Sequence, residues 1–285
     1  MGVRRAVEMA LRESQLKSAV YTLGPLIHNP MVLNELQARG VEILEESGLP
    51  AGSDSGFSLE NSTVIIRAHG VSPVVEGEIK RAGAAILDAT CPFVKESQKK
   101  ARDFAERGYR VFLAGEAMHG EIAGIRGYVD LYGGVSSSCL VVGNPAGAEE
   151  AAAELFRREP AAKTALIGQT TIGAKEYNAI GERIRAFFPQ LEIEKTICSA
   201  TLDRQEALRE LCKKTDAIII AGSRESANTR RLLSLARELG KPGWLVETQA
   251  DIPPEISGYA TIGLSAGAST PDKLIDEIEA VLKAL

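Results

Sequence analysis

The sequence predicts an α/β protein made of three similar parallel-sheet units arranged around one central site. Strand-like apolar runs alternate with helical patterns through most of the 285 residues, which is typical of βαβ units with right-handed crossovers. Cys91 and Cys198 each end a strand-like run, and they divide the chain into three pieces of comparable length. Small polar residues follow almost every predicted strand, at the edge where open parallel sheets bind ligands.

We expect the units to span residues 1–91, 92–190 and 191–285. Besides the run that ends at Cys198, the predicted strands are short apolar runs at residues 63–67, 84–88, 110–114, 139–142, 164–167, 217–221, 244–247 and 261–265. Helical spacing of apolar residues predicts helices at residues 1–15, 93–107, 148–157, 175–188, 202–213, 229–239 and 272–285. Ser72-Pro73 and Thr270-Pro271 place a capping residue before a proline at a first helical position.

The first predicted helix has an apolar stripe suited to packing on a sheet, at Val3, Ala6, Val7, Ala10 and Leu11. A helix of this kind normally follows a strand, and none precedes it in the sequence. We therefore expect a strand and a turn upstream of Met1.

Composition excludes several classes of function. Hydrophobic residues make up 45% of the chain and charged residues 25%, as in an ordinary globular protein. The net charge of −5 argues against nucleic-acid and anionic-membrane partners. We find no signal-peptide pattern and no apolar run near the ~18 residues of a membrane span. Four cysteines without regular spacing do not predict a disulfide framework, so we expect a reduced, cytoplasmic protein.

The residues that follow the predicted strands are suited to anion binding. Ser226, Asn228 and Ser269 stand near helix starts, where neutral donors and helix dipoles can hold a phosphate or diphosphate. His28 and His69 would add two more donors. Each residue also has a simpler interpretation, because serine and asparagine often only cap helices and a loop histidine is often only hydrogen-bonded.

Cys91 and Cys198 are candidate metal or cluster ligands, since both follow strands whose ends converge. Cysteine is also a common core residue, so burial is the alternative for each thiol. Cys139 and Cys212 lie within a predicted strand and a predicted helix, which favours packing.

The His119-x-Glu121 pattern does not predict a zinc site. Zinc deaminases pair H-x-E with P-C-x-x-C, and zinc hydrolases use H-E-x-x-H; both partner patterns are missing from the sequence. We therefore interpret Glu121 as an acid–base group held near a site by His119 and Gln169-Thr170.

Several short motifs, in order along the chain, resemble the 4-hydroxy-3-methylbut-2-enyl diphosphate reductase family. They include Ile27-His28-Asn29, Ala68-His69-Gly70-Val71-Ser72, Asp88-Ala89-Thr90-Cys91-Pro92, His119-Gly120-Glu121, Gln169-Thr170-Thr171, Cys198-Ser199-Ala200-Thr201, Ser226-Ala227-Asn228 and Ala266-Gly267-Ala268-Ser269-Thr270-Pro271-Asp272. The resemblance implies three α/β lobes around a 4Fe-4S cluster that is held by three cysteines and keeps one iron free.

The resemblance also implies a role for each candidate residue. Cys91 and Cys198 would be cluster ligands, and Glu121 would supply a proton with Thr170 beside it. The substrate's diphosphate would be surrounded by His28, His69, His119, Ser226, Asn228 and Ser269. Reductive removal of the allylic hydroxyl would give isopentenyl and dimethylallyl diphosphates, with a ferredoxin or flavodoxin as electron donor.

The chain departs from the family pattern at three places. The family opens with Gly-Phe-Cys-x-Gly-Val, whose cysteine is the first cluster ligand, whereas Gly2-Val3 matches only its end. We expect the missing cysteine upstream of Met1; replacement by Cys139 or Cys212 is the alternative. Ala227 stands where serine is frequent, and Glu225 stands where asparagine is common.

Two other functions remain open from the sequence. One is a cluster-free, inactive homologue that binds diphosphate. The other is an α/β enzyme of another class, such as a phosphosugar isomerase or a zinc hydrolase that uses Cys91, Cys198 and a histidine.

Overall fold

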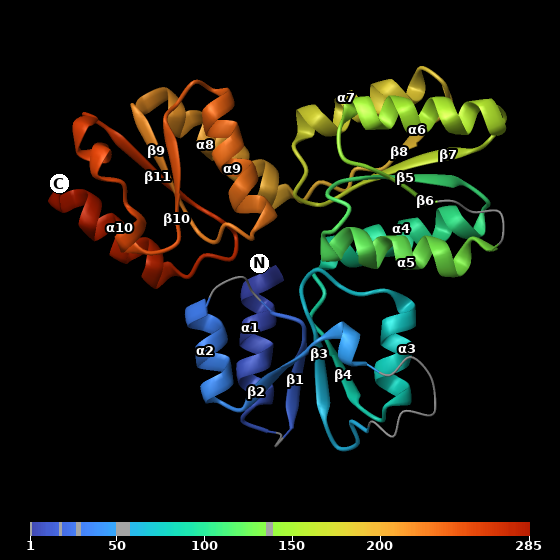
Figure 1. Cartoon of the computed structure of the whole chain (residues 1–285), viewed down its shortest axis with the longest axis horizontal. Coiled ribbons are helices and arrows are strands. Elements are labelled where there is room, and N and C mark those ends of the chain that lie inside the picture. Colours follow the sequence, from blue (N-terminus) through green and yellow to red (C-terminus); the bar gives the residue numbers. More distant parts are fainter. Residues whose placement is uncertain (1, 17–18, 27–29, 50–57, 135–138) are drawn as a thin grey trace. The chain divides into compact units, whose positions relative to one another are not determined.

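The computed structural model describes residues 2–16, 19–26, 30–49, 58–134 and 139–285. Within these residues the chain forms three parallel sheets and ten α-helices (Figure 1). This architecture confirms the predicted α/β class. None of the described helices combines the length and apolarity that a membrane span requires.

The first sheet has the strand order β2-β1-β3-β4, and all of its pairings are parallel. Its strands are β1 (Val20–Leu23), β2 (Val41–Leu44), β3 (Thr63–Ile66) and β4 (Ala85–Asp88). Its helices are α1 (Gly2–Glu13), α2 (Pro30–Ala38) and α3 (Pro73–Arg81), with a short 3-10 helix, η1 (Glu46–Gly48), after β2. The core on one face gathers Leu23, Val64, Ile66 and Ile79.

The second sheet has the order β6-β5-β7-β8, again with parallel pairings. Its strands are β5 (Arg110–Ala114), β6 (Cys139–Val142), β7 (Thr164–Gly168) and β8 (Glu192–Ile193). The helices are α4 (Pro92–Glu106), α5 (Gly120–Tyr132), α6 (Pro145–Arg158) and α7 (Ala174–Arg185). Strand residues alternate between two cores, one shared with α4 and α5 and the other with α6 and α7, because successive side chains of a strand point to opposite faces.

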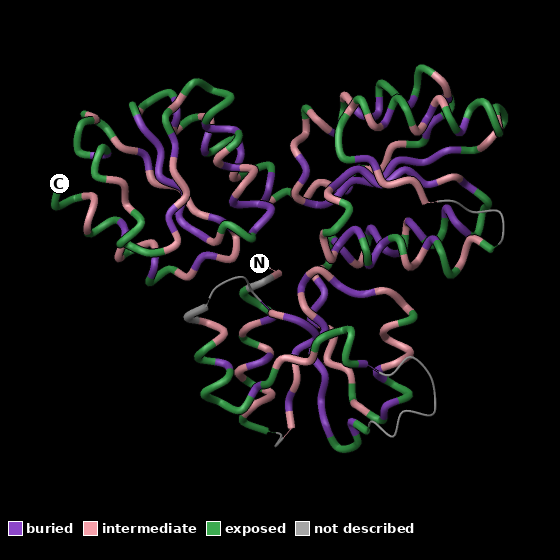
Figure 2. Tube along the Cα trace, viewed as in Figure 1, coloured by how far each residue is buried: buried purple, intermediate pink, exposed green. Residues whose placement is uncertain are grey.

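The third sheet has the order β10-β9-β11. Its strands are β9 (Ala217–Ala221), β10 (Gly243–Val246) and β11 (Ile262–Ala266), and its helices are α8 (Ser199–Lys214), α9 (Ala227–Glu238) and α10 (Asp272–Ala284). Two 3-10 helices, η3 (Gln249–Asp251) and η4 (Pro254–Gly258), precede β11. In all three sheets the buried strands lie beneath helices whose outer faces are exposed (Figure 2).

Each sheet is built from one continuous stretch of the chain. The first two sheets belong to one compact unit, and the third belongs to another, which includes Cys198–Leu285. The residue boundaries predicted at 91 and 190 stay a prediction.

Of the two helix caps predicted at Ser72 and Thr270, the structure contains only the first. Ser72 caps α3 as predicted, because its hydroxyl accepts a bond of 3.3 Å from the Val75 N–H. The cap predicted at Thr270 is wrong: α10 begins at Asp272, and the Thr270 hydroxyl donates to the Ala221 carbonyl at 2.9 Å. The hydroxyl joins the ends of β9 and β11 instead of capping a helix.

Candidate active site

The first compact unit brings four predicted residues to strand ends. His69 follows β3, His119 and Glu121 follow β5, and Thr170 follows β7. The His69 and His119 rings meet edge to face, with their centroids 4.8 Å apart. This contact joins the carboxyl edge of the first sheet to the start of α5.

Glu121 is a carboxyl group buried against the end of β7. Its side chain is 1% exposed. Oε1 accepts a 2.6 Å bond from the Thr170 backbone N–H, and Oε2 lies 2.9 Å from the Thr170 hydroxyl. Burial raises the pKa of Glu121 to about 7, although the bonds from Thr170 act in the opposite direction. The group can therefore hold or release a proton near neutral pH.

His119 caps the helix that carries Glu121. Its Nδ1 accepts a 3.2 Å bond from the Glu121 backbone N–H. An accepting Nδ1 carries no proton, so the ring proton of neutral His119 lies on Nε2. The bond at Nδ1 thus fixes the tautomer of the neutral ring.

Gln169 holds the turn that leads to His119. Its fully buried side chain accepts a 3.0 Å bond from the Glu116 N–H and donates to the Thr171 hydroxyl at 3.0 Å. A Cβ at Gly115 would lie only 2.7 Å from Gln169 Oε1. Glycine at this position therefore lets Gln169 reach across to the turn.

Cys91 begins α4 next to the His69 turn. Its backbone N–H donates to the Ala68 carbonyl at 2.9 Å, and its thiol makes no capping bond to a described residue. The start of α1 packs on it, since a Cβ at Gly2 would lie 3.0 Å from Cys91 Sγ. Cys91 is half-buried.

Cys198 begins α8, and the segment before it is anchored to β7. The Thr196 hydroxyl accepts a 2.8 Å bond from the Gly168 N–H and donates to the Gly168 carbonyl at 2.9 Å. The Tyr177 hydroxyl lies 2.7 Å from the Glu194 carbonyl. Sequence reasoning missed Thr196, because a threonine beside a cysteine has no distinctive pattern until the fold pairs it with Gly168.

The other two cysteines lie in packed positions. Cys139 packs beside the α4–α5 core, and burial raises the pKa of its thiol to about 12. Cys212 is buried between α8 and the third sheet, and burial raises its pKa as well. Within the described residues, no three Cys, His, Asp or Glu side chains gather as a metal site.

The second compact unit places its predicted anion-binding residues after β9 and β11, which are neighbouring strands. Ser226 caps α9, accepting a 3.4 Å bond from the Thr229 N–H. Asn228, in the first turn of α9, is 6% exposed, and its Nδ2 has no partner among the described residues. Ser269 is half-buried beyond β11. Glu225 is exposed, and Ala227 is buried.

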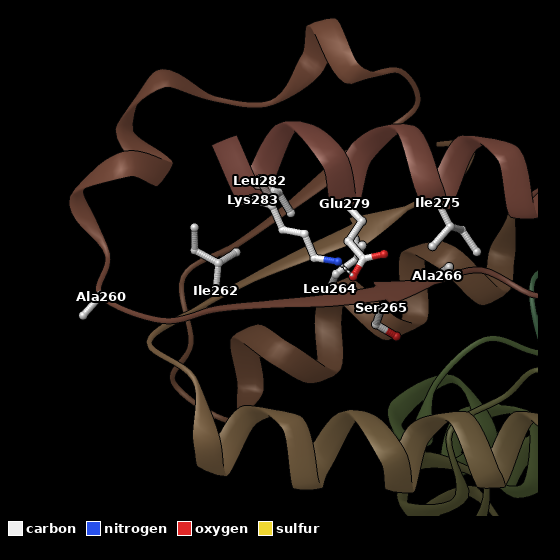
Figure 3. Close-up of a pocket in the computed structure, with 9 residues that line it drawn as sticks. All are labelled: Ala260, Ile262, Leu264, Ser265, Ala266, Ile275, Glu279, Leu282 and Lys283. Carbon is white, nitrogen blue, oxygen red and sulfur yellow. Dashed lines mark ion pairs between the residues drawn. The ribbon is translucent and has the colours of Figure 1, made fainter. Parts of the chain in front are cut away.

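Two further features lie outside these groups. His28 is not among the described residues. A cavity of about 610 Å³ lies between β11 and α10, lined by apolar side chains such as Ile262 and Leu264 and by the Glu279–Lys283 ion pair (Figure 3). No predicted site residue in the described part of the chain lines this cavity.

A comparison with models of protein families finds one family that matches almost the whole chain, including the motifs and the residues at the strand ends. The family model described as LytB protein matches residues 1–283. The chain belongs to the LytB family. A LytB relative from Treponema pallidum, named 4-hydroxy-3-methylbut-2-enyl diphosphate reductase, is 45% identical over 99% of this chain and 80% of its own length. The relative of the same name from Treponema denticola is 42% identical over 98% of this chain and 93% of its own.

Solved LytB structures share the fold. The E-1-hydroxy-2-methyl-but-2-enyl-4-diphosphate reductase from Plasmodium falciparum superposes with a TM-score of 0.85 at 25% identity, covering 98% of this chain and 83% of that one. A second structure, titled as the terminal enzyme of the non-mevalonate pathway, has a TM-score of 0.69 at 33% identity, with 100% and 95% coverage. The two solved structures and the two relatives from Treponema all carry the name of a reductase.

Proposed function

We propose that this protein reduces 4-hydroxy-3-methylbut-2-enyl diphosphate to isopentenyl and dimethylallyl diphosphates. The reaction takes up two electrons and two protons, breaks the allylic C–O bond and releases water. The observation that carries the proposal is the buried Glu121 carboxyl, with a pKa of about 7 and two contacts to Thr170. The names of the LytB relatives support the same reaction.

The geometry of Glu121 suggests the path of one proton. Oε1 faces the Thr170 backbone N–H, which can only donate, so the proton of the neutral carboxyl lies on Oε2. The Thr170 hydroxyl, 2.9 Å from Oε2, can accept this proton while it donates its own. Glu121 is thus the general acid, and Thr170 passes the proton toward the leaving hydroxyl.

Each compact unit has its own candidate donors for an anion. In the first unit, His119 begins α5 with its Nδ1 bound to the Glu121 N–H, and the His69 ring lies beside it. In the second unit, Ser226, Asn228 and Ser269 stand near helix starts, where phosphate groups are stabilised. Asn228 Nδ2, which has no partner in the described part of the chain, is a buried donor that needs an acceptor. We include His28 in this set on the sequence motif.

A 4Fe-4S cluster fits the chemistry of two thiols. Cys91 and Cys198 begin helices, are half-buried, and make no capping bonds to described residues. Thiolates are the usual protein ligands of such clusters. When bound, the cluster would supply electrons and polarise the allylic hydroxyl.

The proposal includes an electron donor and a compartment. A ferredoxin or flavodoxin would deliver the electrons one at a time to the cluster. Cys91, Cys139, Cys198 and Cys212 are all free thiols. This supports a reducing compartment, the cytoplasm.

The test is an anaerobic assay of the purified full chain with substrate and a chemical reductant, with both products measured by mass spectrometry. We expect product from the wild-type protein and a kcat lower by roughly 10²- to 10⁴-fold in Glu121→Gln. Glu150→Gln is the matched control, because it removes a carboxylate from an exposed position on α6.

Absence of product, or full activity in Glu121→Gln, would contradict the proposal. Iron and acid-labile sulfide are measured on the same samples. A chain that binds pyrophosphate but holds no iron would instead be the cluster-free homologue.

A further inference from the structure

Arg67 is a cation at the edge of the first sheet that the proposed function leaves unused. It follows β3, and its side chain is only 19% exposed. The guanidinium lies against two glycines, Gly24 after β1 and Gly120 at the start of α5. A Cβ at Gly120 would lie 3.0 Å from Nη2, and one at Gly24 would clash with Nη1. The guanidinium therefore occupies space that both positions leave by lacking a side chain.

The guanidinium has more hydrogen-bond donors than its surroundings satisfy. Its Nε is buried and has no partner among the described residues. Its ion pair is with Glu46, whose Oε1 lies 3.5 Å from Nη2, at the limit of a hydrogen bond. Arginine presents its N–H groups as a planar fork that matches phosphate oxygens. Donor capacity thus remains for an anionic ligand.

The position of Arg67 is electrostatically unusual. The N-terminus of a helix carries a partial positive charge, which disfavours a nearby cation and attracts an anion. Arg67 contacts the first residue of α5, directly beside His119. An anion bound there would be attracted by both the guanidinium and the helix.

We propose that Arg67 binds the substrate's diphosphate and supplies the fixed positive charge of the site in the first compact unit. The inference rests on the proposed function, since the diphosphate is that of its substrate. It gives Arg67 a role different from that of His119, whose Nδ1 accepts the Glu121 backbone N–H at the start of α5. Gly24 and Gly120 have the matching role of making room for the guanidinium.

The experiment titrates the full chain with inorganic pyrophosphate in a calorimeter. We expect Arg67→Met and Arg67→Gln to weaken binding by roughly ten- to a hundredfold, and Arg67→Lys to bind with intermediate affinity. Arg126→Met is the matched control, because it removes the same charge from an exposed position on α5. It should bind as the wild type does. Circular dichroism and thermal melting check that each variant is folded.

Either of two results would overturn the role of Arg67: wild-type affinity in a folded Arg67→Met or Arg67→Gln variant, or an Arg67→Lys variant that binds no better than these two. If the wild-type chain binds no pyrophosphate, this inference fails together with the diphosphate site of the proposed function. If binding depends on Arg67 but the anaerobic assay yields no product, the role of Arg67 is supported and only the proposed reaction fails.

Discussion

At the scale of single residues, the surroundings of Glu121 determine its protonation. An exposed glutamate has a pKa near 4.5, and burial raises that of Glu121 to about 7. Two contacts from Thr170 lower the pKa but do not offset the loss of water. Near neutral pH, therefore, a large fraction of the Glu121 carboxyl groups carry a proton, which a general acid requires.

The same pKa makes folding stability depend on pH. Because the folded-state pKa is raised, the proton on Glu121 stabilises the fold fully below pH 4.5, and this contribution is lost as the pH rises through about 7. The loss approaches about 3 kcal/mol above pH 7. Urea unfolding at about pH 5 and about pH 8 measures it, and Glu121→Gln should remove this part of the pH dependence.

The control for this prediction is again Glu150→Gln, which should leave the pH dependence unchanged because its carboxylate is exposed. An unaltered pH dependence in Glu121→Gln would mean that Glu121 does not carry the buried proton.

Some of the contacts between single residues could be predicted from the sequence. The His119-x-Glu121 and Gln169-Thr170 patterns suggest that these residues meet, and hydrogen bonds join them. The burial of Glu121 could not be predicted, because it depends on how α5 packs against the end of β7. Arg67 was visible only as a strand-end residue, since its contacts with Gly24 and Gly120 join segments far apart in the chain.

At the scale of elements, the strands of the second sheet were easier to predict than those of the first. Residues 110–114 and 164–168 are apolar except for Arg110 and Thr164 at their first positions, as in strands covered on both faces. β1 and β2 have polar Thr22 and Glu42 at inner positions, which interrupt the apolar run, and were missed. α5 was missed as well, because its glycines weaken the helical pattern.

Thr196 links the segment before α8 to the end of β7, and a substitution can test how much this link stabilises the fold. Thr196→Val keeps the shape of the side chain but removes both bonds to Gly168, at the buried end of β7. We expect a loss of about 1–3 kcal/mol in the free energy of unfolding, measured by urea denaturation with an unchanged slope. Thr196→Ser should recover most of the loss, and an unchanged midpoint in Thr196→Val would contradict the prediction.

At the scale of the whole molecule, the four cysteines divide into two kinds. After anaerobic reconstitution, Cys91→Ser and Cys198→Ser should each hold little iron and acid-labile sulfide. Cys139→Val and Cys212→Ala are the controls, because their thiols are packed beside apolar cores. Loss of iron from a control, with the fold intact, would reverse this assignment. The sequence could show which thiols follow predicted strands. It could not show which thiols pack against an apolar core.

The three sheets take their strands from residues 20–88, 110–193 and 217–266, without exchange between them. Each colour range in Figure 1 accordingly fills one sheet. During synthesis, therefore, a ribosome releases all strands of one sheet before the first strand of the next, at about 5–20 residues per second. The apolar strands of the first sheet can pair and be covered by helices while the second sheet is still being translated. No strand of the first sheet therefore has to stay unpaired until a later sheet is synthesised.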